Sequence, residues 1–300
     1  MATINLADKY SKKIVDKFYV DSVVLGKTSK EYDWDGVQSI KVWTINTYAP
    51  TDYAKPGNDN AITGAHARYG STYEVADTVQ VMTLTQDKAV SLSVDKGNNT
   101  EQMLIKNAGT VMARELREQF VPMFDKYALA RWSGQMATAP SWAANITTSA
   151  DGALAKNTIV EKIFDGVTAI RNAGTDVSDA YCYIGESLFA KLLLSNEFVN
   201  YQNPAFGERN LERGVMGKVR GVEVVPVPDD YFTTAGNANL NAGINFMIVK
   251  KSVVLTPTKI KDAKVHSDPV GISGALLEVR WLFDAFALNT KAKGIYVSLA

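Results

Sequence analysis

Residues 101–132, EQMLIKNAGTVMARELREQFVPMFDKYALARW, carry the strongest helical pattern in the chain. Apolar side chains recur there at steps of three and four, and charged side chains occupy the opposite face. The pattern predicts one amphipathic helix from Thr100 or Glu101 to about Trp132, roughly 45–50 Å long. A compact chain of 300 residues is about 50 Å across, so such a helix would run the length of the molecule. Pro122 is expected to kink the helix or split it at Gln119–Val121.

The segment before this helix predicts strands around a long polar loop. Strand patterns cover residues 37–48, 72–75, 79–85 and 90–94, and a turn is expected at 95–98. Between the first two lies Ala49–Ser71, rich in Pro, Gly, Asn and Asp. A two-stranded ribbon is marginally stable alone, and a loop of this length is usually functional or disordered. The composition fits a projecting loop that becomes ordered when it lies against another molecule. It fits a flexible surface loop equally well.

Two further segments flank these. Residues 1–35 mix basic and acidic side chains and predict a short amphipathic helix followed by an arm that ends near Gly36. After the long helix the pattern becomes α/β. It predicts helices from residue 157 or 158 to 174 and at 187–194, a polar loop at 195–217, and strands at 180–185, 219–227, 244–249, 253–255, 276–289 and 294–299. In the 276–289 strand, alternation predicts two faces. Leu277, Val279, Trp281 and Phe283 share one face, and Glu278, Arg280 and Asp284 share the other.

Composition restricts the classes of function. Lys plus Arg and Asp plus Glu both number 32, so the formal charge is zero, which argues against nucleic-acid or acidic-membrane binding by bulk charge. No apolar run reaches the roughly 18 residues that span a bilayer, and the first residues lack the apolar core of a secretory signal. The single cysteine, Cys182, forbids an intrachain disulfide and fits a reducing compartment.

No residue constellation indicates catalysis, a cofactor or a metal. The two histidines are 200 positions apart, and the glycines match no phosphate-binding loop. His266 is expected in a polar turn, Cys182 as a buried apolar residue, and Asp229 with Asp230 as capping carboxylates. Glu115 and Glu118, with Glu101, are expected to form ion pairs with neighbouring arginines. A carboxylate-dependent hydrolase or lyase remains an alternative, and a β-rich adhesin is disfavoured by the long helix.

The order of these parts resembles the major capsid proteins of tailed bacteriophages with the HK97-type fold. The strands around Ala49–Ser71 look like the extended loop of that family, and Glu101–Trp132 looks like its spine helix. Residues 217–228, GKVRGVEVVPVP, resemble its glycine-rich turn and axial strand, and residues 280–294, RWLFDAFALNTKAKG, resemble its ending. The likeness covers nearly all of the chain. Each motif alone is weak, and their order carries the resemblance.

The resemblance implies an α+β fold of five parts. These are an N-terminal arm (1–36), an extended loop with flanking strands (37–99), a spine helix (100–133), an axial α/β domain (134–250) and a returning β-ladder of the peripheral domain (251–300). The arm is shorter than the cleaved scaffolding segment of many relatives, so assembly is expected to need a separate scaffolding protein or none. Lys55 is the only lysine in Ala49–Ser71, and no cross-linking partner is assigned to it.

The implied function is self-assembly, with no enzyme activity and no cofactor. Copies of the chain would form hexamers and pentamers of an icosahedral head that encloses double-stranded DNA without reading its sequence and without a membrane. Scaffolding, portal or decoration proteins would be further partners, with assembly in the bacterial cytoplasm and the virion as destination. An encapsulin-like nanocompartment shell is the alternative. The expected inter-subunit contact residues are Tyr53, Lys55, His66, Arg68, Tyr69, Arg114 and Arg117.

Overall fold

Alternating side chains near the N-terminus form an antiparallel ribbon in the computed structural model of the chain. Its strands are β1 (Ser39–Ile45) and β2 (Asp77–Thr83), and their pairing runs from Ser39 opposite Thr83 to Ile45 opposite Asp77. Both predicted strands are confirmed, with shifted ends. A short strand was expected at 72–75. Its two described residues, Glu74 and Val75, lie outside any strand, so the prediction is wrong for these two.

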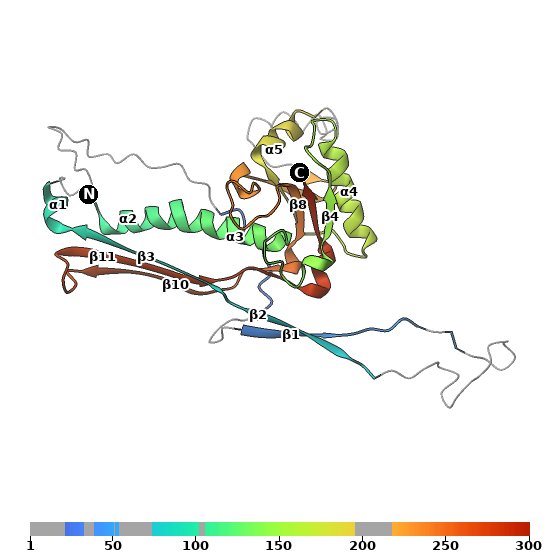
Figure 1. The fold of residues 1–300 in the computed structure, drawn as a ribbon, viewed down its shortest axis with the longest axis horizontal. Coiled ribbons are helices and arrows are strands. Elements are labelled where there is room, and N and C mark those ends of the chain that lie inside the picture. The colour runs from blue at the N-terminus through green and yellow to red at the C-terminus, as the bar shows by residue number, and fades with distance from the viewer. Residues whose placement is uncertain (1–21, 33–38, 51, 54–73, 102–105, 196–217) are drawn as a thin grey trace. The chain divides into compact units, whose positions relative to one another are not determined.

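The structure describes residues 22–32, 39–50, 52–53, 74–101, 106–195 and 218–300, drawn as ribbon in Figure 1. The chain divides into two compact units, Ser39–Thr83 and the remainder. The smaller unit is narrower than the expected 37–99 segment because the strand after Thr83 pairs with the larger unit. The expected N-terminal helix and nearly all of the loop at 195–217 lie outside the described residues.

The long helix begins later than its pattern predicts. A short helix, α1 (Lys96–Glu101), replaces the turn expected at 95–98, and the long helix then starts with α2 (Ala108–Glu115). Asn107 sets this start, because its side chain accepts a hydrogen bond from the Gly109 N–H at 3.0 Å. The helix continues through η1 (Leu116–Phe120) and α3 (Val121–Ser133), and Gly134 ends it in the left-handed conformation with φ 69°.

Pro122 leaves this helix continuous and does not split it at Gln119–Val121. Residues 116–120 form one π-helical turn, in which the Val121 N–H donates to the Leu116 carbonyl, five residues back. Pro122 lies in the first turn of α3. A proline ring collides with the carbonyl four residues before it, and a widened turn at that point removes the conflict. The irregularity therefore lies one turn before the proline.

A three-stranded antiparallel sheet packs against the helix. Its order is β10 (Thr258–Ser267), β11 (Gly274–Phe283) and β3 (Gln86–Asp95). The predicted inward face of β11 is confirmed, because Leu277, Val279, Trp281 and Phe283 are all buried. Phe120 and Phe124 place their rings 5.3 and 6.3 Å from the Trp281 ring. The strand ends at Phe283, short of residue 289, and a separate β12 (Phe286–Ala287) pairs with β9 (Val254–Leu255).

A six-stranded mixed sheet holds the main core of the larger unit. Its order is β4 (Thr147–Ala150), β13 (Ile295–Leu299), β8 (Ile244–Lys250), β5 (Ala180–Gly185), β7 (Val222–Val227) and β6 (Lys218–Val219). The single strand expected at 219–227 is wrong. It is a hairpin, because Arg220 and Gly221 both adopt positive φ, 50° and 88°, as a two-residue hairpin turn requires.

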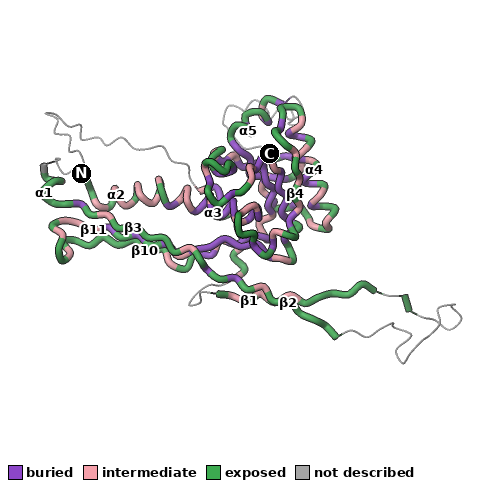
Figure 2. Tube along the Cα trace, viewed as in Figure 1, coloured by how far each residue is buried: buried purple, intermediate pink, exposed green. Residues whose placement is uncertain are grey.

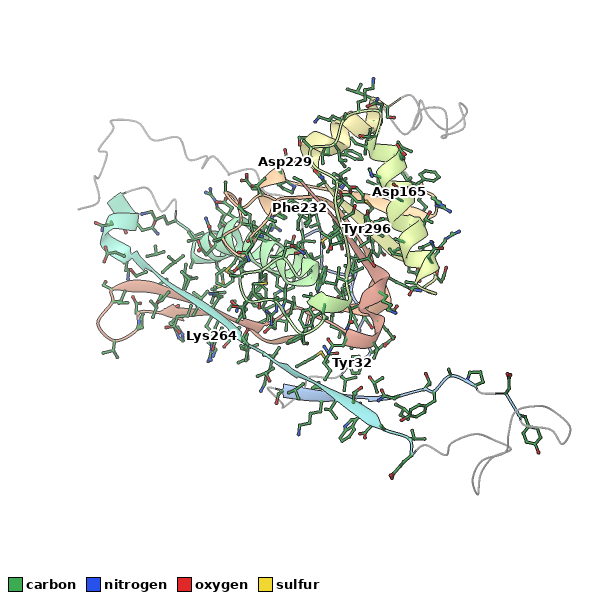
Figure 3. The ribbon with its side chains drawn as sticks, turned by 45° about the vertical axis from the view of Figure 1, so that its right-hand side comes forward. Tyr32, Asp165, Asp229, Phe232, Lys264 and Tyr296 are labelled. Carbon is green, nitrogen blue, oxygen red and sulfur yellow. The ribbon has the colours of Figure 1, made fainter. Side chains whose placement is uncertain are left out.

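Helices cover both faces of this sheet. On one face, α4 (Ile159–Asn172) and α5 (Glu186–Leu193) bury an aliphatic core, and both helices confirm their predictions. On the other face, the Trp132 ring of α3 lies 6.5 Å from the Tyr183 ring of β5. Tyr296, labelled in Figure 3, packs so closely on α4 that a Cβ on Gly166 would lie 2.7 Å from its ring. Short 3-10 turns complete the fold: η2 (Ala143–Asn145), η3 (Asp229–Tyr231), η4 (Lys251–Val253) and η5 (Asn289–Gly294).

Candidate assembly surfaces

The ribbon exposes an apolar face. Trp43 lies opposite Val79, and the neighbouring pair is Lys41 with Val81, so these side chains share one face. Trp43 is 65% exposed, Ile45 70%, Val79 41% and Val81 58%. Figure 2 shows the contrast between this largely exposed ribbon and the buried segments around the six-stranded sheet. Exposed apolar side chains gathered on one face mark an interaction site or an aggregation hazard.

The chain beyond the ribbon contains most of the predicted contact residues. Tyr53 is described and is 42% exposed. The Tyr48 hydroxyl donates to the Glu74 carbonyl at 3.1 Å, which ties the two chain segments together beyond the strands. Lys55, His66, Arg68 and Tyr69 lie outside the described residues, so their predicted contacts are untested.

The two predicted arginines lie on the long helix. Arg114 on α2 directs its Nε to Glu118 Oε1 at 3.2 Å, the i,i+4 pair that the sequence predicts. Arg117 on η1 is exposed. The helix at α2 has no buried residue, so this end presents a mostly accessible surface. An ion pair of this kind contributes only a few tenths of a kcal/mol to an isolated helix. The pair of Arg114 and Glu118 therefore adds little to the stability of the helix, and the predicted contacts of the two arginines with other subunits stay a prediction.

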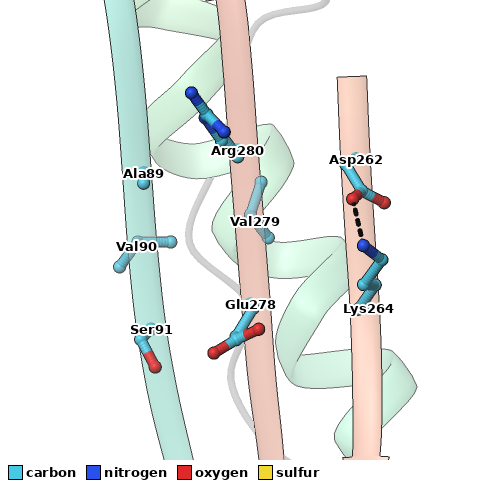
Figure 4. Close-up of a pocket in the computed structure, with 8 residues that line it drawn as sticks. All are labelled: Ala89, Val90, Ser91, Asp262, Lys264, Glu278, Val279 and Arg280. Atoms are coloured by element: carbon cyan, nitrogen blue, oxygen red, sulfur yellow. Dashed lines mark ion pairs between the residues drawn. The ribbon is translucent and has the colours of Figure 1, made fainter. Parts of the chain in front are cut away.

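The outer face of the three-stranded sheet forms a shallow groove of about 480 Å³, shown in Figure 4. Its centre is lined by small side chains of β3, including Ala89 and Ser91. Arg280 Nη2 lies 2.6 Å from Asp87 Oδ2, and Lys264 Nζ lies 2.7 Å from Asp262 Oδ2. The hydrogen bond from Arg280 lowers the pKa of Asp87, and the one to Asp262 raises the pKa of Lys264. The charges on this exposed face are thus already paired within the chain.

His266 corrects a sequence prediction. It lies in strand β10 and not in a polar turn, and its Nε2 is 3.3 Å from Glu278 Oε2 across the sheet. The Lys-rich sequence of β10 lacks the apolar alternation that marks a strand, and this is why the strand was missed. His266 and Glu278 are both more than 40% exposed, so their contact is a surface contact.

Two buried carboxylates of the larger unit hold segments that are distant in the sequence. Alternation predicts Asp284 on the outward face of its strand, and this is wrong, because the strand ends at Phe283 and Asp284 is buried. Asp284, completely buried, accepts hydrogen bonds from Thr85 N at 2.9 Å, Thr85 Oγ1 at 2.7 Å, Tyr127 OH at 2.8 Å and Ala285 N. Asp125 on α3 accepts from Ser22 Oγ at 2.7 Å and Val23 N at 2.9 Å. Thr85 lies two residues after the last residue of the ribbon, and Ser22 lies within the segment 1–36 that is predicted to be the arm.

The described residues hold no group of His, Cys, Asp and Glu side chains suited to a metal ion. Cys182 is completely buried, as predicted, and burial raises the pKa of its thiol to about 12. Asp229, labelled in Figure 3, caps α5 by accepting from the Ser187 N–H at 3.1 Å, as its capping role predicts. No helix of the described residues has both the length and the apolar character to cross a membrane.

The chain shares its fold with chains of phage capsids. A chain of Mycobacterium phage Che8 superposes with a TM-score of 0.72 at 13% identity, covering 98% of this chain and 96% of that one. A chain from the capsid of cyanophage P-SCSP1u gives 0.68 at 13% identity, covering 98% and 92%. One from the mature capsid of bacteriophage PhiM1 gives 0.65 at 14% identity, covering 98% and 92%. No family model and no curated protein matches the sequence.

Proposed function

We propose that this chain is the major capsid protein of a tailed bacteriophage, many copies of which assemble into an icosahedral head. The observation that supports this most strongly is the extent of the structural likeness. It covers 98% of the chain and more than nine tenths of each of the three phage chains compared above, and so includes both compact units. Fold alone does not define function, so the proposal also depends on surfaces that need a partner.

We assign the parts of the chain to those of an HK97-type subunit. Residues 1–36 act as the arm, 37–99 as the extended loop with its strands, and 100–133 as the spine, whose helix starts at Ala108. Residues 134–250 form the axial domain and 251–300 the returning peripheral ladder. The six-stranded sheet with its covering helices supports the axial assignment, and the sheet packed on the long helix supports the peripheral one.

The proposed partners are other copies of the chain, arranged as hexamers and pentamers. The apolar face of the ribbon supports this arrangement, because Trp43, Ile45, Val79 and Val81 are exposed in the described part of the chain and another copy can cover them. Tyr53, Arg114 and Arg117 are proposed contact residues, together with Lys55, His66, Arg68 and Tyr69. Many weak contacts of this kind act together in a closed shell, because each contact raises the effective concentration for the next.

The proposed head encloses DNA without reading its sequence. A formal charge of zero fits a shell that surrounds the genome and makes no extended contact with its phosphates. Assembly in the bacterial cytoplasm, with scaffolding, portal or decoration proteins, and incorporation into the virion belong to the same proposal, as does the lack of an enzymatic role. The nanocompartment alternative is not favoured, because the three similar structures compared above come from phages.

Electron microscopy tests the proposal directly. The purified full-length chain is concentrated and imaged in negative stain, alone and after co-expression with the phage genes that neighbour its own. We expect closed particles, or hexamers and pentamers that close when a scaffolding protein is supplied. A chain that stays monomeric in every condition would refute the proposal. Closed particles that package a protein instead of DNA would favour the nanocompartment.

A further inference from the structure

A short N-terminal stretch of the chain packs against a buried carboxyl group of the larger unit. We call this stretch, Ser22–Ser29, the docked segment. Its residue Val24 is completely buried, and its last N–H, that of Ser29, donates to the Val254 carbonyl at 2.9 Å. Its first residues contact Asp125 of α3, which is only 1% exposed. The docked segment is therefore held at both ends, and one of these ends depends on a titratable group.

The contact with Asp125 suits the protonated acid as well as the carboxylate. The Val23 N–H donates to Asp125 Oδ2 at 2.9 Å, and a main-chain N–H can only donate. Ser22 Oγ lies 2.7 Å from Asp125 Oδ1, and a hydroxyl can either donate or accept. The same oxygen accepts a hydrogen bond from the Leu25 N–H at 3.1 Å. The Ser22 hydroxyl can therefore donate to the carboxylate or accept from the acid, and the segment stays in contact in both states.

The titratable groups around Asp125 come from the docked segment and from two elements of the larger unit. In the segment, the charge of Lys27 lowers the pKa of Asp125, while burial lowers the pKa of Lys27 itself against the opposing charge of Glu223 on β7. Tyr183 of β5 and Tyr231 of η3 face the carboxyl from the sheet side, where burial and then the Asp125 charge raise the pKa of both hydroxyls. Both tyrosines are therefore neutral at neutral pH, and neither offers a positive charge to an ionised Asp125.

Burial decides the balance at Asp125. It raises the pKa of the carboxyl from 3.8 to about 6, although hydrogen bonds from Ser22 and Val23 and the charge of Lys27 act in the opposite direction. When the docked segment leaves, water reaches the carboxyl from the side that Val23 and Val24 cover, and the pKa returns toward its ordinary value. The attached state therefore binds the proton more tightly than the released state, so acid favours attachment and rising pH favours release.

We propose that Asp125 is a pH-sensitive attachment point, which holds the docked segment in acid and releases it, with the rest of the fold intact, as the pH rises. The contribution of the proton is complete below about pH 4 and is lost as the pH rises through 6. Over this range the equilibrium between the attached and released states shifts by up to about a hundredfold.

The docked segment can detach separately because it belongs to no sheet of the larger unit. Its main chain joins β9 through one isolated bridge, between Ser29 and Leu255, and its release breaks no strand pairing of the six-stranded sheet. Segments with few main-chain bonds to a core open locally at a lower free energy than the core itself. The inference concerns the single subunit and does not depend on the proposed capsid function.

Hydrogen exchange of the full-length, unassembled chain tests the proposal, with mass spectrometry of peptides as the readout. The N–H groups of Val23 and Ser29 are hydrogen-bonded to the larger unit only while the segment is attached. Protection factors, corrected for the pH dependence of intrinsic exchange, are compared between a peptide of residues 22–29 and one from β8. We expect the protection of the docked segment to fall about twentyfold from about pH 4.5 to about pH 7.5. It should lie below that of β8 at every pH, since β8 reports global unfolding.

Two asparagine variants assign the effect to one carboxyl group. Asp125→Asn cannot titrate, and its amide can still donate to Ser22 and accept from Val23, so protection of the docked segment should no longer depend on pH. Asp151→Asn is the matched control, because the Asp151 side chain is only 3% exposed and its contacts with Ser149, Ser298 and Lys162 lie outside the segment. Although burial opposes them, hydrogen bonds lower the pKa of Asp151, so this variant should keep the wild-type pH dependence.

Three outcomes would overturn the inference. The first is wild-type protection of the docked segment that is constant or rises with pH. The second is a wild-type pH dependence that persists in Asp125→Asn. The third is equal protection of the docked segment and β8 at every pH, because the segment would then leave only when the whole subunit unfolds. Asp125→Ser, a second side chain that does not titrate, takes the place of Asp125→Asn if that variant fails to fold.

Discussion

Asp284 joins three separate parts of the chain while being completely buried. It accepts two hydrogen bonds from Thr85, one from Tyr127 on α3, and one from the following main chain. A buried carboxylate is tolerated only when its lone pairs are satisfied in this way. The carboxylate therefore fixes where the chain enters the larger unit after the ribbon.

Replacing this carboxylate should cost more stability than removing any one of its partners. Asp284→Ala leaves the buried hydrogen-bond donors of Thr85 and Tyr127 without an acceptor. We therefore expect the free energy of unfolding to fall by about 3 kcal/mol. Tyr127→Phe removes a single donor and should cost about 1 kcal/mol. Urea unfolding of the unassembled subunit measures both. Equal losses in the two variants would show that Asp284 is not the centre of the network.

Asp125 makes folding stability depend on pH. Burial raises the pKa of its carboxyl from 3.8 to about 6, against the opposing effect of hydrogen bonds from Ser22 and Val23. Since the folded protein holds this proton more tightly than the unfolded chain, the group's stabilising contribution is complete below about pH 4 and lost as the pH rises through 6. The shift corresponds to about 3 kcal/mol.

The asparagine variant isolates this contribution, because Asp125→Asn cannot titrate. We expect the difference in unfolding free energy, wild type minus variant, to fall by up to about 3 kcal/mol between pH 4 and pH 7. Urea titrations of both proteins at several pH values provide the measurement. A difference that stays constant, or rises with pH, would contradict the assignment.

At the scale of elements, the widened turn before Pro122 shapes the long helix. The π-helical turn at Leu116–Phe120 brings Phe120 onto Trp281 together with Phe124. Pro122→Ala restores an N–H and allows this turn to become regular α-helix, which changes how the two parts of the helix align. We expect particle diameter or curvature to shift, measured by electron microscopy. Unchanged particles with an unchanged helix would remove this role for the proline.

Elements with a local signature were predictable from the sequence. Strand β5, helices α4 and α5, and the inward face of β11 follow from apolar runs or period-two alternation. The start of the long helix was missed because Asn107 lies inside an otherwise helical pattern and its capping bond overrides the periodicity. Strand β10 was missed because its side chains are almost all exposed and carry no apolar period.

The candidate surfaces were predictable only in part. The ribbon follows from two alternating segments around a polar loop, although its exposed face depends on pairing register. Arg280 and Asp87 are 193 positions apart and meet only because β3 and β11 pair. The place of β3 at one edge of its sheet likewise depends on strand order, which no local pattern specifies. Which strands pair over long sequence distances cannot be predicted from local patterns in a single sequence.

For the whole molecule, the projecting loop is expected to matter for assembly and not for folding. Deleting Asp52–Arg68 and joining the ends with a short Gly-Ser linker removes chain from the smaller unit only. The six-stranded sheet and the sheet packed on the helix lie in the larger unit. We expect a soluble subunit with wild-type circular dichroism and melting temperature that cannot form closed particles.

Two outcomes would contradict this prediction. Closed particles of normal size from the deletion variant would mean that neighbouring subunits do not need the loop. A variant that fails to fold would mean that the loop stabilises its own subunit. Gel filtration and negative-stain images of the same preparation separate these results from the expected one.

The complete burial of the sole thiol has a practical consequence. With Cys182 shielded inside β5, a cysteine introduced anywhere on the surface would be the single site open to maleimide reagents. Dyes, spin labels or gold clusters can then be placed on the ribbon or the three-stranded sheet without background from the native residue. Each stage of growth, from lone subunit to finished particle, thereby becomes accessible to distance measurements in solution.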